Sequence, residues 1–222
     1  SNEDTNKWVA LKIQKGSPSY QEEAENEIRI LNIVKDYTKN LDPYDIIEHT
    51  GFLRNLMIRH AENTNEIMVN IVTNFEDTTI LQPLADELVK KIPDIKSIVN
   101  NITTRKSGVS IGEDETTIYG NNFIKEKING LTFNISANSF FQTNTKQTEK
   151  LYSMIINESN LIGDEIVYDL YSGTGTIGIS MAKHVKSVYG FEISDSSIND
   201  ALINAKINNI NNIKFFKGDL QN

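Results

Sequence analysis

The chain has 222 residues, of which 38% are hydrophobic and 23% are charged, a composition typical of a soluble globular protein. Its formal net charge of −8 argues against a surface built mainly for phosphate backbones, because Lys and Arg supply that affinity, although a local basic groove is compatible with it. No segment offers the roughly 18 consecutive apolar residues that a membrane-spanning helix needs, so no membrane partner is expected.

The first half of the chain, residues 1–135, predicts a small α+β domain with a helix at its N-terminal end. Residues 20–37 have a helical period of apolar residues and are interpreted as an amphipathic packing helix. Residues 52–60 and 66–73 are expected to form a strand hairpin around the polar turn AENTN. The apolar stripe expected to pack the helix comprises Ala24, Ile28, Leu31 and Val34.

A second helix is predicted over residues 79–91, with Pro83 in its first turn, where the missing N–H costs little. Short extended segments divided by Asn, Gly and acidic turns follow it. The side of this helix expected to be buried carries Leu81, Leu84, Leu88 and Ile92. The extended segments are residues 95–102, 116–119 and 131–135.

From residue 136 to 222 helices and strands alternate, which predicts parallel strands of a doubly wound α/β sheet. Three parallel strands are half of such a domain, so we expect a truncated chain. The predicted helices are 145–158, 177–183 and 195–208, and the predicted strands are 165–170, 185–191 and 213–217. Inward-facing residues are expected at Leu151, Tyr152, Ile155, Ile198, Ala201, Leu202 and Ala205, with Ser194 or Asp195 capping the last helix.

The segment IVYDLYSGTGTIG, residues 166–178, carries most of the chemical information. Its glycines at 173, 175 and 178 have the G-x-G-x-x-G spacing of a loop that presses its backbone against a ligand. Asp169 ahead of the glycines would repel a pyrophosphate, whereas it can accept bonds from a cationic ligand or orient the loop around one. S-adenosyl-L-methionine carries an ammonium and a sulfonium and no phosphate, so it is favoured over a nicotinamide dinucleotide and over a loop that only turns the chain.

Carboxyl groups also follow the next two predicted strands. Glu192 in YGFEIS is placed to accept hydrogen bonds from ribose hydroxyls, and Asp219 in KGDLQ to accept one from an adenine amino group. Three acids after three successive parallel strands meet at the same edge of the sheet. This constellation predicts a methyl-donor site.

From about Gly51 onward the sequence resembles the uracil-5 RNA methyltransferase family, class I enzymes that methylate uridine in transfer or ribosomal RNA. The matching segments are GFLRNLMIRH, GEDETTIYG, ISANSFFQTNTKQTEKLY, IVYDLYSGTGTIGISMA and YGFEIS. The resemblance implies a Rossmann-like methyltransferase domain and a cofactor site that includes Gln142, Asp169, Tyr171, Gly173, Gly175, Thr176, Glu192 and Asp219. Family members tend to have cysteine where this chain has Ser172.

In the chemistry that the resemblance implies, a thiolate adds to uracil C6, C5 takes the methyl group, and a carboxylate base removes the C5 proton. Both groups lie, in the family, beyond the end of this chain, which contains no cysteine. We therefore predict no catalytic residue here and no methyltransferase activity of this chain alone. The absence of cysteine fits a cytoplasmic protein, and the scattered His49, His60 and His184 predict no metal site.

Contacts to RNA are harder to assign from the sequence. Arg54, Arg59 and His60 lie on a predicted strand and Arg105-Lys106 in a loop, where a solvated face is the more common interpretation. Phe140 and Phe141 are interpreted as core rather than as base-stacking residues, and Gln142 is expected to be drawn inward by its apolar neighbours.

Two other functions fit part of the pattern. One is a class I methyltransferase with a different target, such as a guanine amine or a small molecule. The other is a noncatalytic RNA-binding protein that keeps a cofactor-shaped domain. The sequence after the fourth strand of the sheet would separate them.

Overall fold

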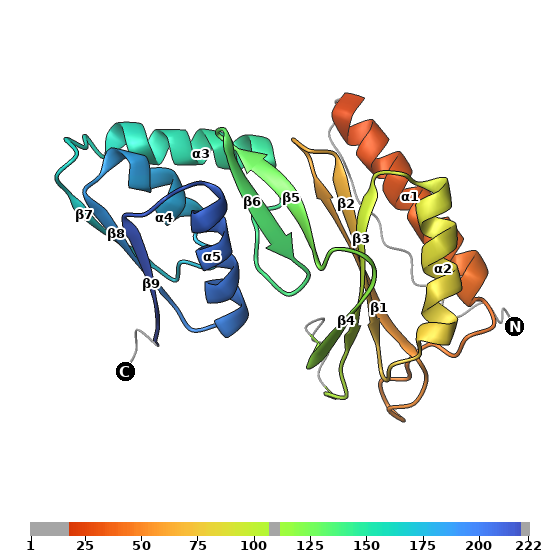
Figure 1. The fold of residues 1–222 in the computed structure, drawn as a ribbon. Coiled ribbons are helices and arrows are strands. Elements are labelled where there is room, and N and C mark those ends of the chain that lie inside the picture. Colours follow the sequence, from red (N-terminus) through yellow and green to blue (C-terminus); the bar gives the residue numbers. More distant parts are fainter. Residues whose placement is uncertain (1–17, 107–111, 219–222) are drawn as a thin grey trace, which may run out of the picture.

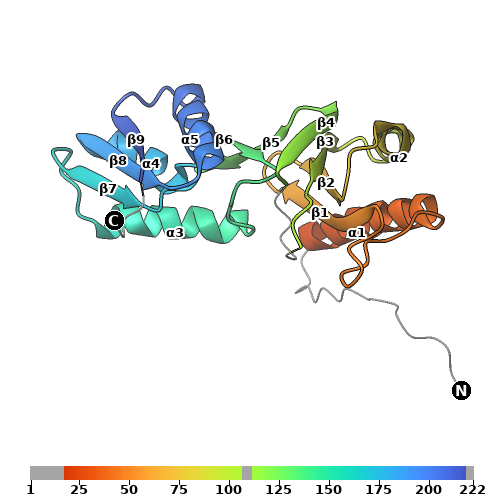
Figure 2. The ribbon, with the colours of Figure 1, turned by 90° about the horizontal axis from the view of Figure 1, so that it is seen from below.

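The computed structural model describes residues 18–106 and 112–218 of the chain. Two units lie side by side, and a two-stranded hairpin runs between them (Figures 1 and 2). The first unit is a four-stranded sheet with two helices, and the second is a three-stranded parallel sheet with its helices. This α/β architecture with a Rossmann-like second unit confirms the predicted fold class.

The first unit has the strand order β1-β2-β3-β4, in which only the central pair β2 and β3 is parallel. Helices α1 and α2 cover one face of this sheet (Figure 1). The elements are α1 (Pro18–Thr38), β1 (Leu53–Ala61), β2 (Glu66–Thr73), α2 (Thr78–Lys91), β3 (Ile95–Ile102) and β4 (Asp114–Gly120). The predicted hairpin of β1 and β2 is confirmed by their antiparallel register.

Two predictions about the helices of this unit are wrong. In α1 the residues Ile28 and Leu31 are exposed, and the buried stripe is formed by Ile30 and Ile33 instead. Because two overlapping apolar stripes run along this helix, its period alone could not decide which one meets the sheet. In α2, Pro83 lies inside the helix rather than in its first turn, because the Asp77 cap starts the helix at Thr78. The buried side of α2 is as predicted.

A hairpin of β5 (Phe123–Ile128) and β6 (Leu131–Ser136) joins the two units. Strand β6 was predicted from the sequence, whereas β5 was not. In β5 the inward positions are Ile124, Glu126 and Ile128, and all three are almost completely buried. A glutamate at an inward position conceals the alternation of apolar and polar residues by which a strand is recognised.

The second unit contains α3 (Thr145–Glu158), β7 (Ile166–Leu170), α4 (Thr176–Met181), the 3₁₀ helix η1 (Ala182–His184), β8 (Ser187–Glu192), α5 (Asp195–Ile207) and β9 (Ile213–Lys217). Its strands are parallel in the order β7-β8-β9, as the alternation of helices and strands predicts. Residues of α3, α4 and α5 pack on one face of this sheet and share a hydrophobic core with the β5–β6 hairpin.

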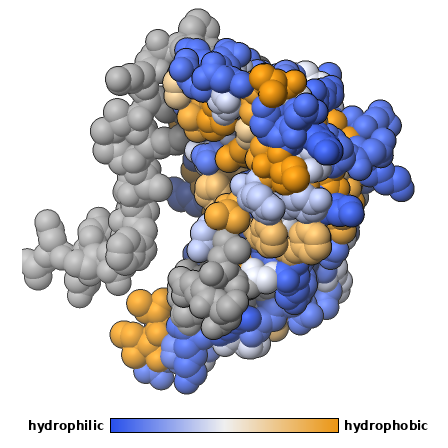
Figure 3. Space-filling model, turned by 90° about the vertical axis from the view of Figure 1, so that its left-hand side faces the viewer, coloured by the Kyte–Doolittle hydropathy of each residue, from blue (hydrophilic) through white to orange (hydrophobic). Residues whose placement is uncertain are grey.

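The opposite face of the three-stranded sheet carries exposed or half-buried aromatic rings from all three strands. Tyr168 stacks on Tyr189 and Phe191, and Phe191 stacks on Phe216. Figure 3 views the molecule from the side of β7 and shows apolar side chains on this part of the surface. Alternation along β7 therefore directs its polar site residue Asp169 into the helix-covered side and Tyr168 to the open face.

Two inward-facing predictions in the second unit are also wrong. Leu151 of α3 and Leu202 of α5 are 42% and 52% exposed, whereas their neighbours Tyr152 and Ala201 are buried. Each helix buries a narrow stripe of small or aromatic residues, and the leucine lies one position to its side.

Candidate functional site

The glycine loop connects β7 to α4 at the carboxyl end of the sheet. Gly173 and Gly175 have φ angles of 54° and 79°, in the left-handed region that favours glycine. A Cβ atom at Gly175 would lie 2.8 Å from the ring of Phe215 and 3.1 Å from Ala201. A side chain is thus excluded beneath Gly175, whereas a Cβ at Gly173 would meet no atom within 4 Å among the described residues.

Asp169 holds the loop from below. Its side chain is 9% exposed, and its Oδ2 accepts a hydrogen bond of 2.9 Å from the backbone N–H of Gly178 in α4. Burial raises the pKa of Asp169, and the bond from Gly178 only partly offsets this. Of the two roles that the sequence analysis left open, this geometry supports orientation of the loop.

Glu192, at the end of β8, is also tied to the loop. Its Oε2 accepts a bond of 2.9 Å from the N–H of Gly173, and its Oε1 accepts bonds from the N–H groups of Ile193 and Ser194 at 2.8 and 2.9 Å. A carboxylate offers about four acceptor positions. Three of these positions accept backbone N–H groups, so roughly one acceptor position remains for a ribose hydroxyl unless one of the backbone bonds breaks.

Tyr171 and Thr176 lie at the two ends of the loop. Tyr171 is 69% exposed and adopts a φ of 60°, which is unusual for a residue with a side chain. The Thr176 hydroxyl at the start of α4 is 2.8 Å from the Tyr152 hydroxyl of α3. Burial raises the pKa of Tyr152, so its hydroxyl stays protonated at neutral pH. Helix α3 is thereby fastened to the loop.

Gln142 lies in the segment that joins β6 to α3. The structure leaves it exposed, so the expectation that its apolar neighbours draw it inward is wrong. Only Phe141 turns into the core, where its ring centroid is 6.3 Å from that of Phe133, while Phe140 is 73% exposed. Consecutive residues of an extended segment point in opposite directions, so burying Phe141 exposes both of its neighbours.

The remaining predicted residues divide into two groups. Asp219 lies outside the described residues. The basic residues of the first unit make internal contacts: Arg54 donates to the carbonyl oxygens of Thr103 and Arg105, and Arg59 donates to that of Ala137 at 3.0 Å. His60 is 2.8 Å from the Asn65 side chain.

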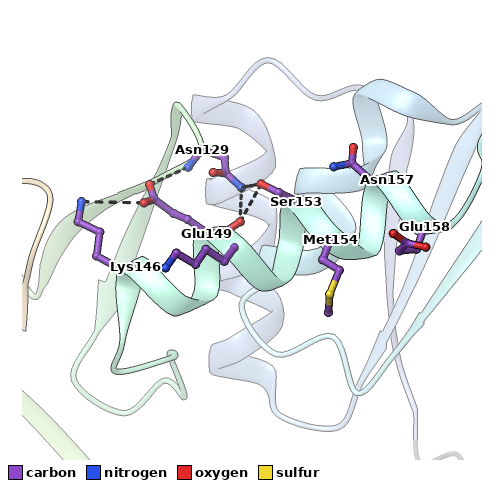
Figure 4. Close-up of a pocket in the computed structure, with 8 residues that line it drawn as sticks. Asn129, Lys146, Glu149, Ser153, Met154, Asn157 and Glu158 are labelled. Atoms are coloured by element: carbon purple, nitrogen blue, oxygen red, sulfur yellow. Dashed lines mark hydrogen bonds and ion pairs between the residues drawn. The ribbon is translucent and has the colours of Figure 1, made fainter.

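A separate groove of about 490 Å³ runs along the outer side of α3. Figure 4 shows Asn129 of the hairpin turn and residues of α3 lining it, among them Lys146, Glu149 and Glu158. Its charges largely compensate one another, since Glu149 lies 3.9 Å from Lys146 and accepts a bond from Asn129. None of the glycine-loop residues lines this groove.

Comparison with known proteins decides the family. The sequence profile of the tRNA (Uracil-5-)-methyltransferase family matches residues 52–218. The chain belongs to this family. Among its relatives are RNA methyltransferases of uncharacterised function from Chlorobaculum tepidum, 44% identical over 87% of the chain, and from Clostridium acetobutylicum, 41% identical over 89% of it. The chain spans 41% and 43% of the length of these two relatives.

A solved structure agrees with the assignment to the uracil-5 family. The tRNA (uracil-54, C5)-methyltransferase of Pyrococcus abyssi, in complex with S-adenosyl-L-homocysteine, matches 96% of this chain and 51% of its own with a TM-score of 0.72 and 30% identity. The family resemblance predicted from the sequence is therefore confirmed.

Two negative findings apply to residues 18–106 and 112–218. No helix there combines the length and apolar character that crossing a bilayer requires. No group of three or more His, Cys, Asp or Glu side chains in this part of the uracil-5 family member is arranged to hold a metal ion.

Sequence reasoning missed the polar side chains that hold the loop in place. Tyr152 was expected only to pack, yet its hydroxyl reaches Thr176. Asn204 of α5 donates to the carbonyl oxygen of Thr174, inside the glycine loop. A usable signal was present in the segment DALINAKIN, where polar residues recur every four positions at 200, 204 and 208 and so line one side of the helix, next to the stripe that was expected to be apolar.

Proposed function

We propose that this chain is part of an RNA (uracil-C5-)-methyltransferase that transfers a methyl group from S-adenosyl-L-methionine to uridine in transfer or ribosomal RNA. The observation that carries the proposal is the glycine loop, whose Gly173 N–H is bound to the carboxylate of Glu192 at the end of the neighbouring strand. This is where a nucleoside cofactor meets a parallel sheet. Membership in the uracil-5 family supports the choice of target base.

The cofactor is proposed to bind over the carboxyl ends of β7 and β8. Gly173 lets the backbone approach it, Glu192 takes a ribose hydroxyl, and Asp169 keeps the loop in place from beneath. Tyr171, Gly175 and Thr176 complete the loop, and Gln142 presents an exposed amide from the preceding segment. Asp219 is proposed for the adenine amino group on the basis of the resemblance.

The decisive experiment supplies the full-length protein with labelled S-adenosyl-L-methionine and unmodified transfer and ribosomal RNA. Substrate tritiated at uracil C5 should release tritium as the methyl group replaces the proton. Methylation without tritium release would identify a different target atom and favour another class I methyltransferase. Binding of RNA with no transfer to either substrate would favour the noncatalytic alternative.

The 222-residue chain by itself is proposed to be inactive and to bind cofactor weakly. It contains no cysteine, so it cannot supply the thiolate that the implied mechanism adds to C6. Turnover by the purified chain would refute the first statement. Calorimetry that gave micromolar or tighter affinity would refute the second.

The proposal also covers the domain boundaries, the cellular location and the role of the first domain. The two domains are proposed to be residues 1–135 and 136–222, and the protein is proposed to act in the cytoplasm. The first domain is proposed to help position RNA. A truncated protein that begins at residue 122, and so keeps the β5–β6 hairpin, would argue against that role if it methylated RNA as well as the full-length protein.

A further inference from the structure

Strand β6 has one edge that pairs with no other strand among the described residues. Side chains at the C-terminal end of α5 form hydrogen bonds with this edge. In the two-stranded hairpin β6 pairs with β5 on one side, so the N–H and C=O groups of alternate residues face outward on the other. Buried backbone groups of this kind require partners. Figures 1 and 2 show α5 beside this edge.

Two asparagines, Asn204 of α5 and its C-cap residue Asn208, supply those partners and are here called the amide ladder. Asn208 accepts from the N–H of Thr132 at 2.9 Å and donates to its carbonyl oxygen at 2.6 Å. Asn204 does the same for Asn134, at 2.7 and 3.3 Å. The two amides are one helical turn apart and the two strand residues are two apart, so each amide takes the place of a residue in a neighbouring strand.

Asn204 makes one further bond that Asn208 does not. Its amide nitrogen is 3.2 Å from the carbonyl oxygen of Thr174, which lies between the first two glycines of the loop. Asn204 is completely buried, and Thr174 is 2% exposed. One side chain therefore fastens both β6 and the glycine loop to α5.

One turn before Asn204, Asp200 extends the same arrangement. Its Oδ2 accepts hydrogen bonds from the hydroxyls of Ser136 and Ser139. Ser136 ends β6, and Ser139 lies three residues before Gln142. The helix thus holds the segment that carries Gln142 on the same side from which it holds the loop.

We propose that Asn204 is a positioning residue that couples β6, the strand leading into the segment that carries Gln142, to the glycine loop, so that both parts of the cofactor site keep their spacing. The proposal rests on the proposed cofactor role of these two parts. Asn208 makes the same pair of bonds to β6 and none to the loop. It offers a matched control on the same helix.

The first experiment measures amide hydrogen exchange in the full-length protein without cofactor. Asn204→Ala should speed exchange in residues 173–178 as well as in β6, whereas Asn208→Ala should speed it in β6 alone. Equal exchange of the loop in the two variants would overturn the proposal. Should Asn204→Ala fail to fold, Asn204→Asp and Asn208→Asp permit the same comparison, because each keeps the acceptor for its strand N–H and loses the donor to its strand carbonyl oxygen, and only Asn204→Asp also loses the donor to Thr174.

The second experiment measures affinity for S-adenosyl-L-homocysteine by calorimetry. Asn204→Ala should weaken it about tenfold, the effect of losing roughly one well-placed hydrogen bond, and Asn208→Ala should leave it unchanged. Unchanged affinity of Asn204→Ala beside a binding wild type would overturn the positioning role. If the wild type itself did not bind, the proposed function would fail, and loop exchange would still decide whether Asn204 couples the two segments.

Discussion

At the residue scale, Tyr171 is held in a backbone conformation that it does not favour. It is the first residue after β7, its φ of 60° lies in the left-handed region, and its ring is 69% exposed. Such a conformation costs a residue with a Cβ about 1 kcal/mol or more. Because the exposed ring adds little to packing, a tyrosine at this strained position favours a role in ligand binding.

Replacement of Tyr171 by glycine separates strain from binding. Tyr171→Gly should raise the free energy of unfolding by up to about 1 kcal/mol while weakening affinity for S-adenosyl-L-homocysteine. Denaturant titration and calorimetry measure the two effects. Asn160→Gly is the control, since Asn160 has a φ of 48° away from the loop and asparagine tolerates that region. A tighter-binding Tyr171→Gly variant would contradict the assignment.

Asp169 should give the protein a pH dependence that one substitution removes. Burial raises its pKa in the folded state, and a group of this kind stabilises the fold below its unfolded pKa and loses that contribution as pH rises through the folded pKa. Asp169→Asn keeps an acceptor for Gly178 without the charge. Its melting temperature should fall less than that of the wild type as pH rises from about 4 toward 7.

The measurement is a series of thermal unfolding curves for wild type and Asp169→Asn across this pH range. At pH 7 the variant should be at least as stable as the wild type, because it buries no charge. A variant that was less stable at pH 7 and shared the wild-type pH profile would show that the carboxylate contributes more through its bond to Gly178 than it loses through burial.

At the scale of elements, the three-stranded sheet is shaped by close contacts on its helix-covered side. A Cβ atom at Gly190 in β8 would lie 2.5 Å from the Phe215 ring of β9 and 3.1 Å from the Ser172 hydroxyl. Phe215 therefore fills the space that a side chain in β8 would occupy, directly beneath the glycine loop. The position of the loop depends on this packing between strands.

Gly190→Ala should destabilise the protein by about 1–3 kcal/mol, because Phe215 cannot move away without losing its contact with Gly175. The midpoint of urea unfolding gives the change. Gly218→Ala serves as a matched control, since a Cβ there would meet no atom within 4 Å among the described residues. Equal midpoints for wild type and Gly190→Ala would show that Phe215 relaxes freely.

At the scale of the whole molecule, Glu126 joins the two units through the hairpin. It is 1% exposed, and its carboxylate accepts from the N–H groups of Asn63 and Lys127 at 3.0 and 2.7 Å and from the hydroxyl of Thr145 at 2.7 Å. The β1–β2 turn, the hairpin and α3 thus meet at one side chain. Helix α3 begins three residues after Gln142, so this junction also holds the end of the segment that carries Gln142.

Replacing the buried carboxylate should loosen this junction. Glu126→Gln places an NH2 group, which can only donate, against two backbone N–H groups and a hydroxyl that all donate to the carboxylate. The free energy of unfolding should therefore fall by about 2–3 kcal/mol. Glu87→Gln, which breaks an exposed pair with Lys91, should cost under about 0.5 kcal/mol. Chemical denaturation compares them. Similar losses for the two variants would indicate that Glu126 contributes no more than a surface charge.

Regular patterns along the chain were sufficient for much of this architecture. The bounds of β2, β3, α3 and β9 were predicted to the residue, because strong apolar periods and clear caps coincide there. Strand β5 was missed, since two of the partners that allow Glu126 to be buried lie 63 and 19 residues away in the chain. In α1, α3 and α5 some residues predicted to be buried lie one position away from those that are. Which residues of a helix are buried depends on the face that it turns toward the sheet, and this face is set by the tertiary structure.

The sequence by itself determined the family and the position of the glycine loop, because the SFFQTN segment and the glycine spacing are local in the chain. The predicted roles of the site residues and the division at residue 135 stay predictions. Only the tertiary structure decided how the loop is held: by Asp169 from below, by Glu192 from the side and by Asn204 from α5. These bonds join residues 9 to 30 positions apart, and no local pattern records which distant backbone group a polar side chain will reach.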